Sequence, residues 1–179
     1  MRRALALADA IDAVTEWIGQ VLKWLVLIAS LVSAGNALIR YGFNQSSNAW
    51  LEAQWYMFAA MFLLAAGYAL KHDEHVRVDV LFTNYSVRRK AMVDIFGLIF
   101  FLLPTAIVIA DMSIPMIVNS IKINEMSSDP GGLLRWPVKL LIPLGFILLA
   151  IQAVAELIKK IAIVKGLRTP VKHYERPVQ

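Results

Sequence analysis

The sequence predicts an all-α integral membrane protein with four transmembrane helices and both termini on the cytoplasmic side. Of the 179 residues, 59% are hydrophobic and 17% are charged, whereas soluble domains have about 45–50% apolar and about 25% charged residues. The apolar residues fall in four runs of about 20, the length that crosses a bilayer, without the period-two alternation of membrane strands. This composition excludes a disordered chain, a nucleic-acid-binding tail and most soluble single-domain enzymes.

The first segment, residues 1–16, is predicted to be a short amphipathic helix on the membrane surface. Asp9, Asp12 and Glu16 interrupt the apolar run that a cleavable signal peptide requires. Their spacing relative to the apolar residues Leu5 and Ala8 is that of a helix with one charged face. This segment is therefore expected to lie in the interface.

The spans are predicted to form one membrane domain, in which only the ends of the helices carry charge. They cover residues 17–39, 49–70, 91–118 and 138–158, and a basic tail covers 159–179. Lys23 and Glu52 stand near the ends of the first and second spans, where charged side chains reach the headgroups. Pro104 and Pro115 predict kinks in the third span.

The basic residues predict the orientation, because cytoplasmic loops carry an excess of Lys and Arg. Thirteen of the 18 basic residues fall at the N-terminus, in the loop after the second span and in the tail. Four fall in the two loops on the other side, and Lys23 is the remaining one. Both termini are therefore expected in the cytoplasm.

Small residues at helical spacings predict close contacts between helices, since helices in lipid associate through such residues. Ala29, Ser33 and Ala37 follow one another at intervals of four, and Ala60 and Gly67 lie one heptad apart. Two interpretations remain open, namely packing within the four-helix bundle and binding to another membrane protein.

The charged residues within the spans favour pairing over transport. Glu52 lies at the edge of the second span beside Trp55, which indicates a capping or pairing residue next to an aromatic belt. Asp94 follows Lys90 by four residues, so an ion pair is expected. Asp111 is about 25 Å further along the helix, near the opposite interface. A carrier would place a charge at the bilayer centre, and this pattern has none.

No catalytic, cofactor or metal chemistry is indicated. The chain has no cysteine, which excludes thiolate ligands and a cysteine nucleophile. Its three histidines, His72, His75 and His173, all lie outside the predicted spans, so neither a haem nor an intramembrane metal site is expected. The Gly-rich loop that holds ATP phosphates is also missing from the sequence.

Two loops carry the most informative polar residues. After the second span, Arg77 and Asp79 are two residues apart and face the same way in an extended segment. They could pair within the loop or with a partner. In the loop 119–137, turn residues precede Arg135 and Trp136, which form either an outward docking patch or an ordinary membrane-interface anchor.

Several motifs together resemble the small membrane subunit of tripartite ATP-independent periplasmic (TRAP) transporters, in its larger variety. The resemblance runs from about Trp17 to Lys160. The motifs that carry it are Trp50-Leu51-Glu52-Ala53-Gln54-Trp55-Tyr56, His75-Val76-Arg77-Val78-Asp79, Asp94, Leu103-Pro104, Gly131-Gly132-Leu133, Arg135-Trp136-Pro137-Val138-Lys139 and Ile142-Pro143-Leu144-Gly145-Phe146. In the family, a proline often precedes the arginine of the Leu-Leu-Arg-Trp-Pro stretch, and here a leucine does.

The resemblance implies a non-catalytic subunit of the bacterial inner membrane that works in sodium-driven import of an organic acid. Its partners would be a large membrane subunit, which would hold the sodium, and a periplasmic substrate-binding protein. The residues expected to contact the large subunit are Ala29, Ser33, Ala37, Glu52, Trp55, Ala60, Gly67, His75, Arg77, Asp79 and Asp94. Those expected at the rim where the binding protein docks are Arg135, Trp136 and Lys139.

Two other classes of protein remain as alternatives. The first is a free-standing four-helix carrier or channel, in which Glu52 and Asp111 would be the coupling groups. The second is an enzyme or redox membrane subunit, which the small number of histidines disfavours.

Overall fold

Helices make up most of the described residues, and four of them are long and apolar enough to cross a membrane. The computed structural model describes residues 1–45, 47–73 and 85–169. The elements in chain order are α1 (Arg2–Phe43), α2 (Asn48–Leu64), α3 (Ala66–Lys71), α5 (Val87–Gly97), the π-helical turn η1 (Leu98–Leu102), α6 (Leu103–Lys122) and α7 (Trp136–Val164). The all-helical fold with four potential membrane spans is therefore confirmed.

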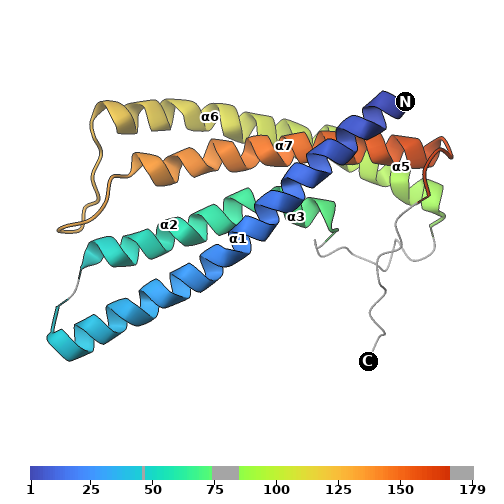
Figure 1. Ribbon diagram of the computed structural model, residues 1–179. Coiled ribbons are helices and arrows are strands. Elements are labelled where there is room, and N and C mark those ends of the chain that lie inside the picture. The colour runs from blue at the N-terminus through green and yellow to red at the C-terminus, as the bar shows by residue number, and fades with distance from the viewer. Residues whose placement is uncertain (46, 74–84, 170–179) are drawn as a thin grey trace.

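The first helix is longer than the sequence predicted. A surface helix was expected to end before Trp17, but α1 continues through 42 residues without a break. At about 1.5 Å per residue its length is about 63 Å, roughly twice the thickness of the hydrocarbon layer. A helix of this length must tilt or project beyond the membrane, and Figure 1 shows α1 crossing the other helices diagonally.

The third span contains a local widening directly before Pro104. The amide of Leu103 donates to the carbonyl of Leu98, which is the five-residue step of a π-helix. Proline lacks an N–H group and its ring crowds the carbonyl four residues earlier, so a wider turn at this place relieves the crowding. Pro115, by contrast, lies inside α6, which continues to Lys122.

Helix α7 is the centre of the bundle. It contacts every other described helix and is the most buried of the four spans, and Figure 1 shows it between α6 and the pair α1 and α2. We call the end of the bundle with Arg2, Lys71 and Val164 the terminal end. The opposite end, where α1 and α6 end and α2 and α7 begin, is the loop end.

Two glycines allow close approach between α7 and the second span. A Cβ atom on Gly145 would lie 2.7 Å from the carbonyl oxygen of Leu63, which is a backbone atom that cannot move aside easily. Gly67 is buried against Gln152 and Leu148, with ordinary contact distances of 3.5 Å. Small residues at this crossing therefore position α2 and α3 against α7, as expected for helices in lipid.

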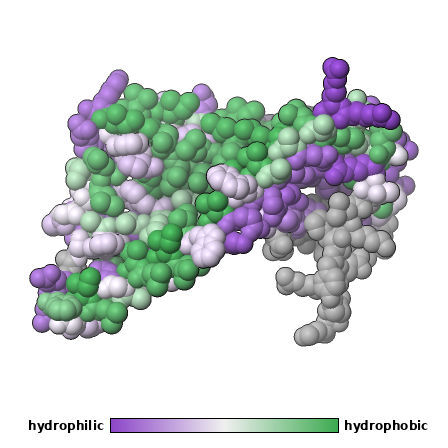
Figure 2. Space-filling model, viewed as in Figure 1, coloured by the Kyte–Doolittle hydropathy of each residue, from purple (hydrophilic) through white to green (hydrophobic). Residues whose placement is uncertain are grey.

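The outer surface of the bundle is mainly apolar. Figure 2 shows large hydrophobic areas over the helices, with hydrophilic residues gathered mainly toward the two ends. Large side chains such as Phe62 (84% exposed) and Met112 (72% exposed) face outward. This arrangement suits a lipid environment, in which burial of apolar groups inside the protein provides little driving force.

Candidate functional site

The loop between α6 and α7 forms a short hairpin at the loop end. The amide of Ser127 donates to the carbonyl of Leu133 at 3.0 Å, and the amide of Arg135 donates to the carbonyl of Glu125 at 2.8 Å. Gly131 has a φ of +71°, which favours glycine because other residues rarely adopt it. Figure 1 shows this loop extending past the ends of both helices.

Three side chains of α2 hold this hairpin. The Asn48 side-chain amide donates to the carbonyl of Pro130 at 2.9 Å, and the Tyr56 hydroxyl donates to the carbonyl of Leu134 at 2.5 Å. Between them, the Glu52 carboxylate accepts from the amide of Leu133 at 2.6 Å. The three residues lie at intervals of four, so they share one face of the helix. We call Asn48, Glu52 and Tyr56 the α2 clamp.

Glu52 is the centre of this clamp and is only 1% exposed. Its carboxylate also accepts a short hydrogen bond from the Ser127 hydroxyl, and the Arg135 guanidinium lies 3.9 Å away. A Cβ atom on Gly132 would lie 2.8 Å from the carboxylate, so glycine makes room for it. Burial of a carboxylate is expensive unless it is hydrogen-bonded, and here the loop supplies the donors.

Two residues predicted for the docking rim also support the hairpin. The Arg135 guanidinium donates to the Ser127 hydroxyl at 3.0 Å, and the Lys139 ammonium forms an ion pair with Glu125. The hydrogen bond from Lys139, aided by the charge of Arg135, lowers the pKa of Glu125 below its ordinary value of 4.5. Arg135 and Lys139 therefore act inside this chain, while their contact with a binding protein stays a prediction.

A second polar cluster joins α1 to α7 at the terminal end. The side chain of Gln152 is fully buried, donates to Asp12 at 2.8 Å and accepts from the Thr15 hydroxyl at 2.7 Å. The Lys159 ammonium forms ion pairs with Asp12 at 2.8 Å and with Glu156 at 2.5 Å. Buried polar groups are costly when unpaired, so this cluster fixes the position of α1 on α7.

Further ion pairs extend the cluster to α3 and α5. Lys71 and His72 both contact Glu16, at 2.6 Å and 2.9 Å. The Asp94 carboxylate binds Lys160 of α7 at 2.6 Å, whereas the sequence suggested a pair with Lys90 on the same helix. The structure thus uses Asp94 to tie α5 to α7.

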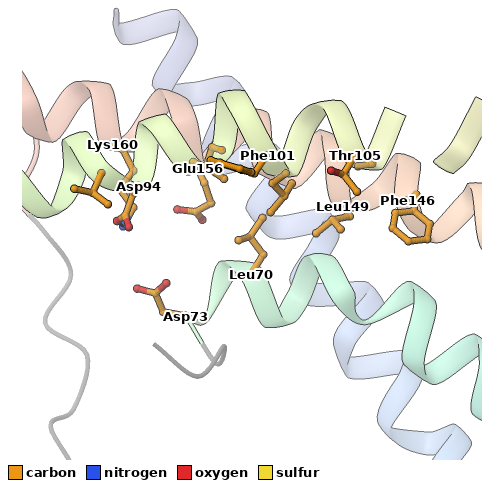
Figure 3. A pocket seen from close by; sticks show the side chains of 14 residues that line it. Leu70, Asp73, Asp94, Phe101, Thr105, Phe146, Leu149, Glu156 and Lys160 are labelled. Carbon is orange, nitrogen blue, oxygen red and sulfur yellow. Dashed lines mark hydrogen bonds and ion pairs between the residues drawn. The ribbon is translucent and has the colours of Figure 1, made fainter. Parts of the chain in front are cut away.

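A cavity of about 530 Å³ opens beside this cluster, between α3, the third span and α7. Figure 3 shows its apolar wall, which includes Leu70 and Phe101, and a charged end with Asp94, Glu156 and Lys160. Among the described residues, no group of three or more His, Asp and Glu side chains could hold a metal ion. The cavity is therefore a groove with one apolar wall and one charged end.

The predicted interface residues have different locations in the structure. Buried within the bundle are Ala29, Glu52 and Gly67; half-buried are Ala60, Asp94, Arg135, Trp136 and Lys139; exposed are Ser33, Ala37 and Trp55. His75, Arg77 and Asp79 lie outside the described residues. Glu52 and Gly67 use their buried positions for contacts within the chain. Their contact with a partner protein stays a prediction.

Sequence reasoning missed several residues that shape both clusters. Asn48 was not linked to Glu52, although its spacing of four residues would place both on one helix face. Asp12 and Glu16 were assigned to a membrane surface, but they bind Lys159 and Lys71. Asp111 is exposed on the outer face of α6, which continues for eleven residues beyond it to Lys122.

The fold and its two polar clusters define a multi-pass helical membrane protein whose polar contacts gather toward the helix ends. A family model described as "Tripartite ATP-independent periplasmic transporters, DctQ component" matches residues 29–162 of the chain. The chain therefore belongs to this family, the small permease component of TRAP transporters. Searches of the curated proteins and of the solved structures gave no match.

Proposed function

We propose that this chain is a non-catalytic brace for the large membrane subunit of a TRAP transporter and that it helps to dock the periplasmic binding protein. The transporter would import an organic acid with sodium across the bacterial inner membrane. Both termini would be cytoplasmic, which would place the loop end in the periplasm. The observation that carries the proposal is the family match over residues 29–162.

The arrangement of polar contacts supports a bracing role. The terminal-end cluster ties α1 and α5 to the central helix α7 and ties α3 to α1. The α2 clamp ties α2 to the hairpin. Such cross-linked ends make a rigid bundle, since each contact joins residues that are far apart in the chain. A rigid bundle suits a static part of a transporter against which another part moves.

The geometry gives less support to a free-standing carrier based on Glu52 and Asp111. Glu52 is buried and accepts hydrogen bonds from the hairpin, so it is not available to a passing ion. Asp111 is on the outer face of α6. A pathway through the bundle would need charged or polar groups that face a shared cavity.

Co-expression with the large subunit and the binding protein of the same transporter tests the proposal. The chain should co-purify with the large subunit in detergent, and proteoliposomes should take up an organic acid only with both membrane subunits, the binding protein and a sodium gradient. Vesicles with this chain alone should show no uptake. Uptake by the chain alone, or a large subunit that functions fully without it, would contradict the proposal.

A further inference from the structure

Asp111 is an acidic side chain on the outer face of a membrane helix. It is exposed, and within the described part of the chain no hydrogen bond or ion pair reaches it. It follows Asp94 by 17 residues, which at about 1.5 Å per residue is about 25 Å. It precedes the end of α6 at Lys122 by eleven residues, or about 16 Å. The carboxylate is therefore flanked by mostly apolar helical residues on both sides, from Ile107 to Ala110 and from Ile114 to Val118.

A lipid environment is unfavourable for this carboxylate. Ionisable residues within membrane spans normally pair with one another or face a polar surface, since lipid chains offer no hydrogen-bond donors. Lysine and arginine can extend their charge to the headgroups, but the short side chain of aspartate cannot. The position of Asp111 therefore indicates a protein partner that supplies a donor at this depth.

A shallow groove between α6 and α7 lies next to this position. It has a volume of about 300 Å³ and is lined by apolar residues, including Ala106, Ala110 and Ala150. Ile107 also lines the groove, and it precedes Asp111 by one helical turn of four residues, so both lie on the same face. Small side chains of this kind let another helix approach closely.

We propose that this face of α6, with Asp111 beside the groove, binds a transmembrane helix of the large membrane subunit. That helix places a lysine or arginine against Asp111. The inference rests on the proposed function and assigns the partner to one face of the bundle. A soluble binding protein is a poor fit for a carboxylate flanked by apolar residues of a membrane helix. A second copy of the chain facing itself across a twofold axis would bring two Asp111 carboxylates toward each other.

Substitution of Asp111 gives the first test. In Asp111→Leu, co-purification of the large subunit should fall about tenfold, the equivalent of one charge-assisted contact, and Asp111→Asn should fall less. The isolated variant chain should unfold in detergent at the same temperature as the wild type or higher, because Asp111 has no hydrogen bond or ion pair to lose among the described residues. Met112→Leu, at an exposed neighbour that points elsewhere on the helix, should leave both measurements unchanged.

Site-directed cross-linking gives the second test, and the chain has no native cysteine to interfere. A photoreactive group on Ile107→Cys should label the large subunit at least about tenfold more than the same group on Phe62→Cys, which is exposed on α2. The labelled peptide should contain or adjoin a basic residue.

The outcomes separate this inference from the proposed function. If the wild-type chain fails to co-purify with the large subunit, the proposed function itself fails. If the subunits co-purify but Phe62→Cys labels as well as Ile107→Cys, or Asp111→Leu assembles normally, the assignment of the face is wrong and the bracing role stands. Labelling of a second copy of the chain through Ile107→Cys would also overturn the assignment.

Discussion

Replacement of Glu52 by alanine should loosen the loop-end hairpin while the helices keep their structure. The carboxylate accepts hydrogen bonds from the Leu133 amide and the Ser127 hydroxyl, and it is shielded from water. Without it, two donors in a water-poor site lose their acceptor. Asn48 and Tyr56 still hold the neighbouring carbonyls, so the hairpin should open more often but should not detach.

The expected cost follows from these two contacts. A hydrogen bond to a charged group contributes about 1.5–3 kcal/mol, so the loss of both at the lower value is about 3 kcal/mol. Arg135, 3.9 Å away and partly exposed, remains hydrated and adds little. Because about 1.4 kcal/mol corresponds to a factor of ten, the open population of the hairpin should rise about 100-fold.

Amide hydrogen exchange in detergent measures this opening, since local opening free energies control protection. The amides of Leu133 and Arg135 should lose about 100-fold protection in Glu52→Ala and about tenfold in Glu52→Gln, which keeps an acceptor but not the charge. Trp55→Phe, at an exposed neighbour on α2, is the control. Unchanged protection of the hairpin in Glu52→Ala would refute the idea that the buried carboxylate holds it.

Two other changes test the packing and the electrostatics. Gly145→Ala should lower the free energy of unfolding by about 1–3 kcal/mol, and with it the thermal midpoint in detergent, because the new Cβ atom meets the backbone of Leu63. Gly67→Ala should have a much smaller effect, since its Cβ atom would have ordinary contact distances. Equal midpoints for the two variants would argue against a tight crossing. The hydrogen bond from Lys139 lowers the folded-state pKa of Glu125 below 4.5, so this contact stabilises the loop fully above pH 4.5 and is lost as the pH falls through the lowered value. Thermal unfolding between pH 6 and pH 3 should therefore show a steeper loss for the wild type than for Glu125→Gln, and parallel curves would exclude this contribution.

The four helices could be predicted from the sequence because lipid leaves the backbone few choices. Apolar runs such as 91–118 must satisfy their N–H and C=O groups internally, and a helix does so within one segment. The position of Glu52 at the edge of its apolar run predicted a capping or pairing role, which its hydrogen bonds confirm. The family resemblance was likewise visible in short motifs, and the family match confirms it.

Only the tertiary structure decided which charges meet. Asp12 and Lys159 are 147 residues apart, and Glu52 and Leu133 are 81 apart, so no local spacing could pair them. Ion pairs of this kind also hold the N-terminal half of α1 against the bundle, since its acidic face binds cations of α3 and α7. The sequence by itself determined that the chain crosses a membrane as four helices, because each span satisfies its own backbone. The arrangement of those helices depended on side chains distant in sequence, whose charges are stable in an apolar environment only when they find each other.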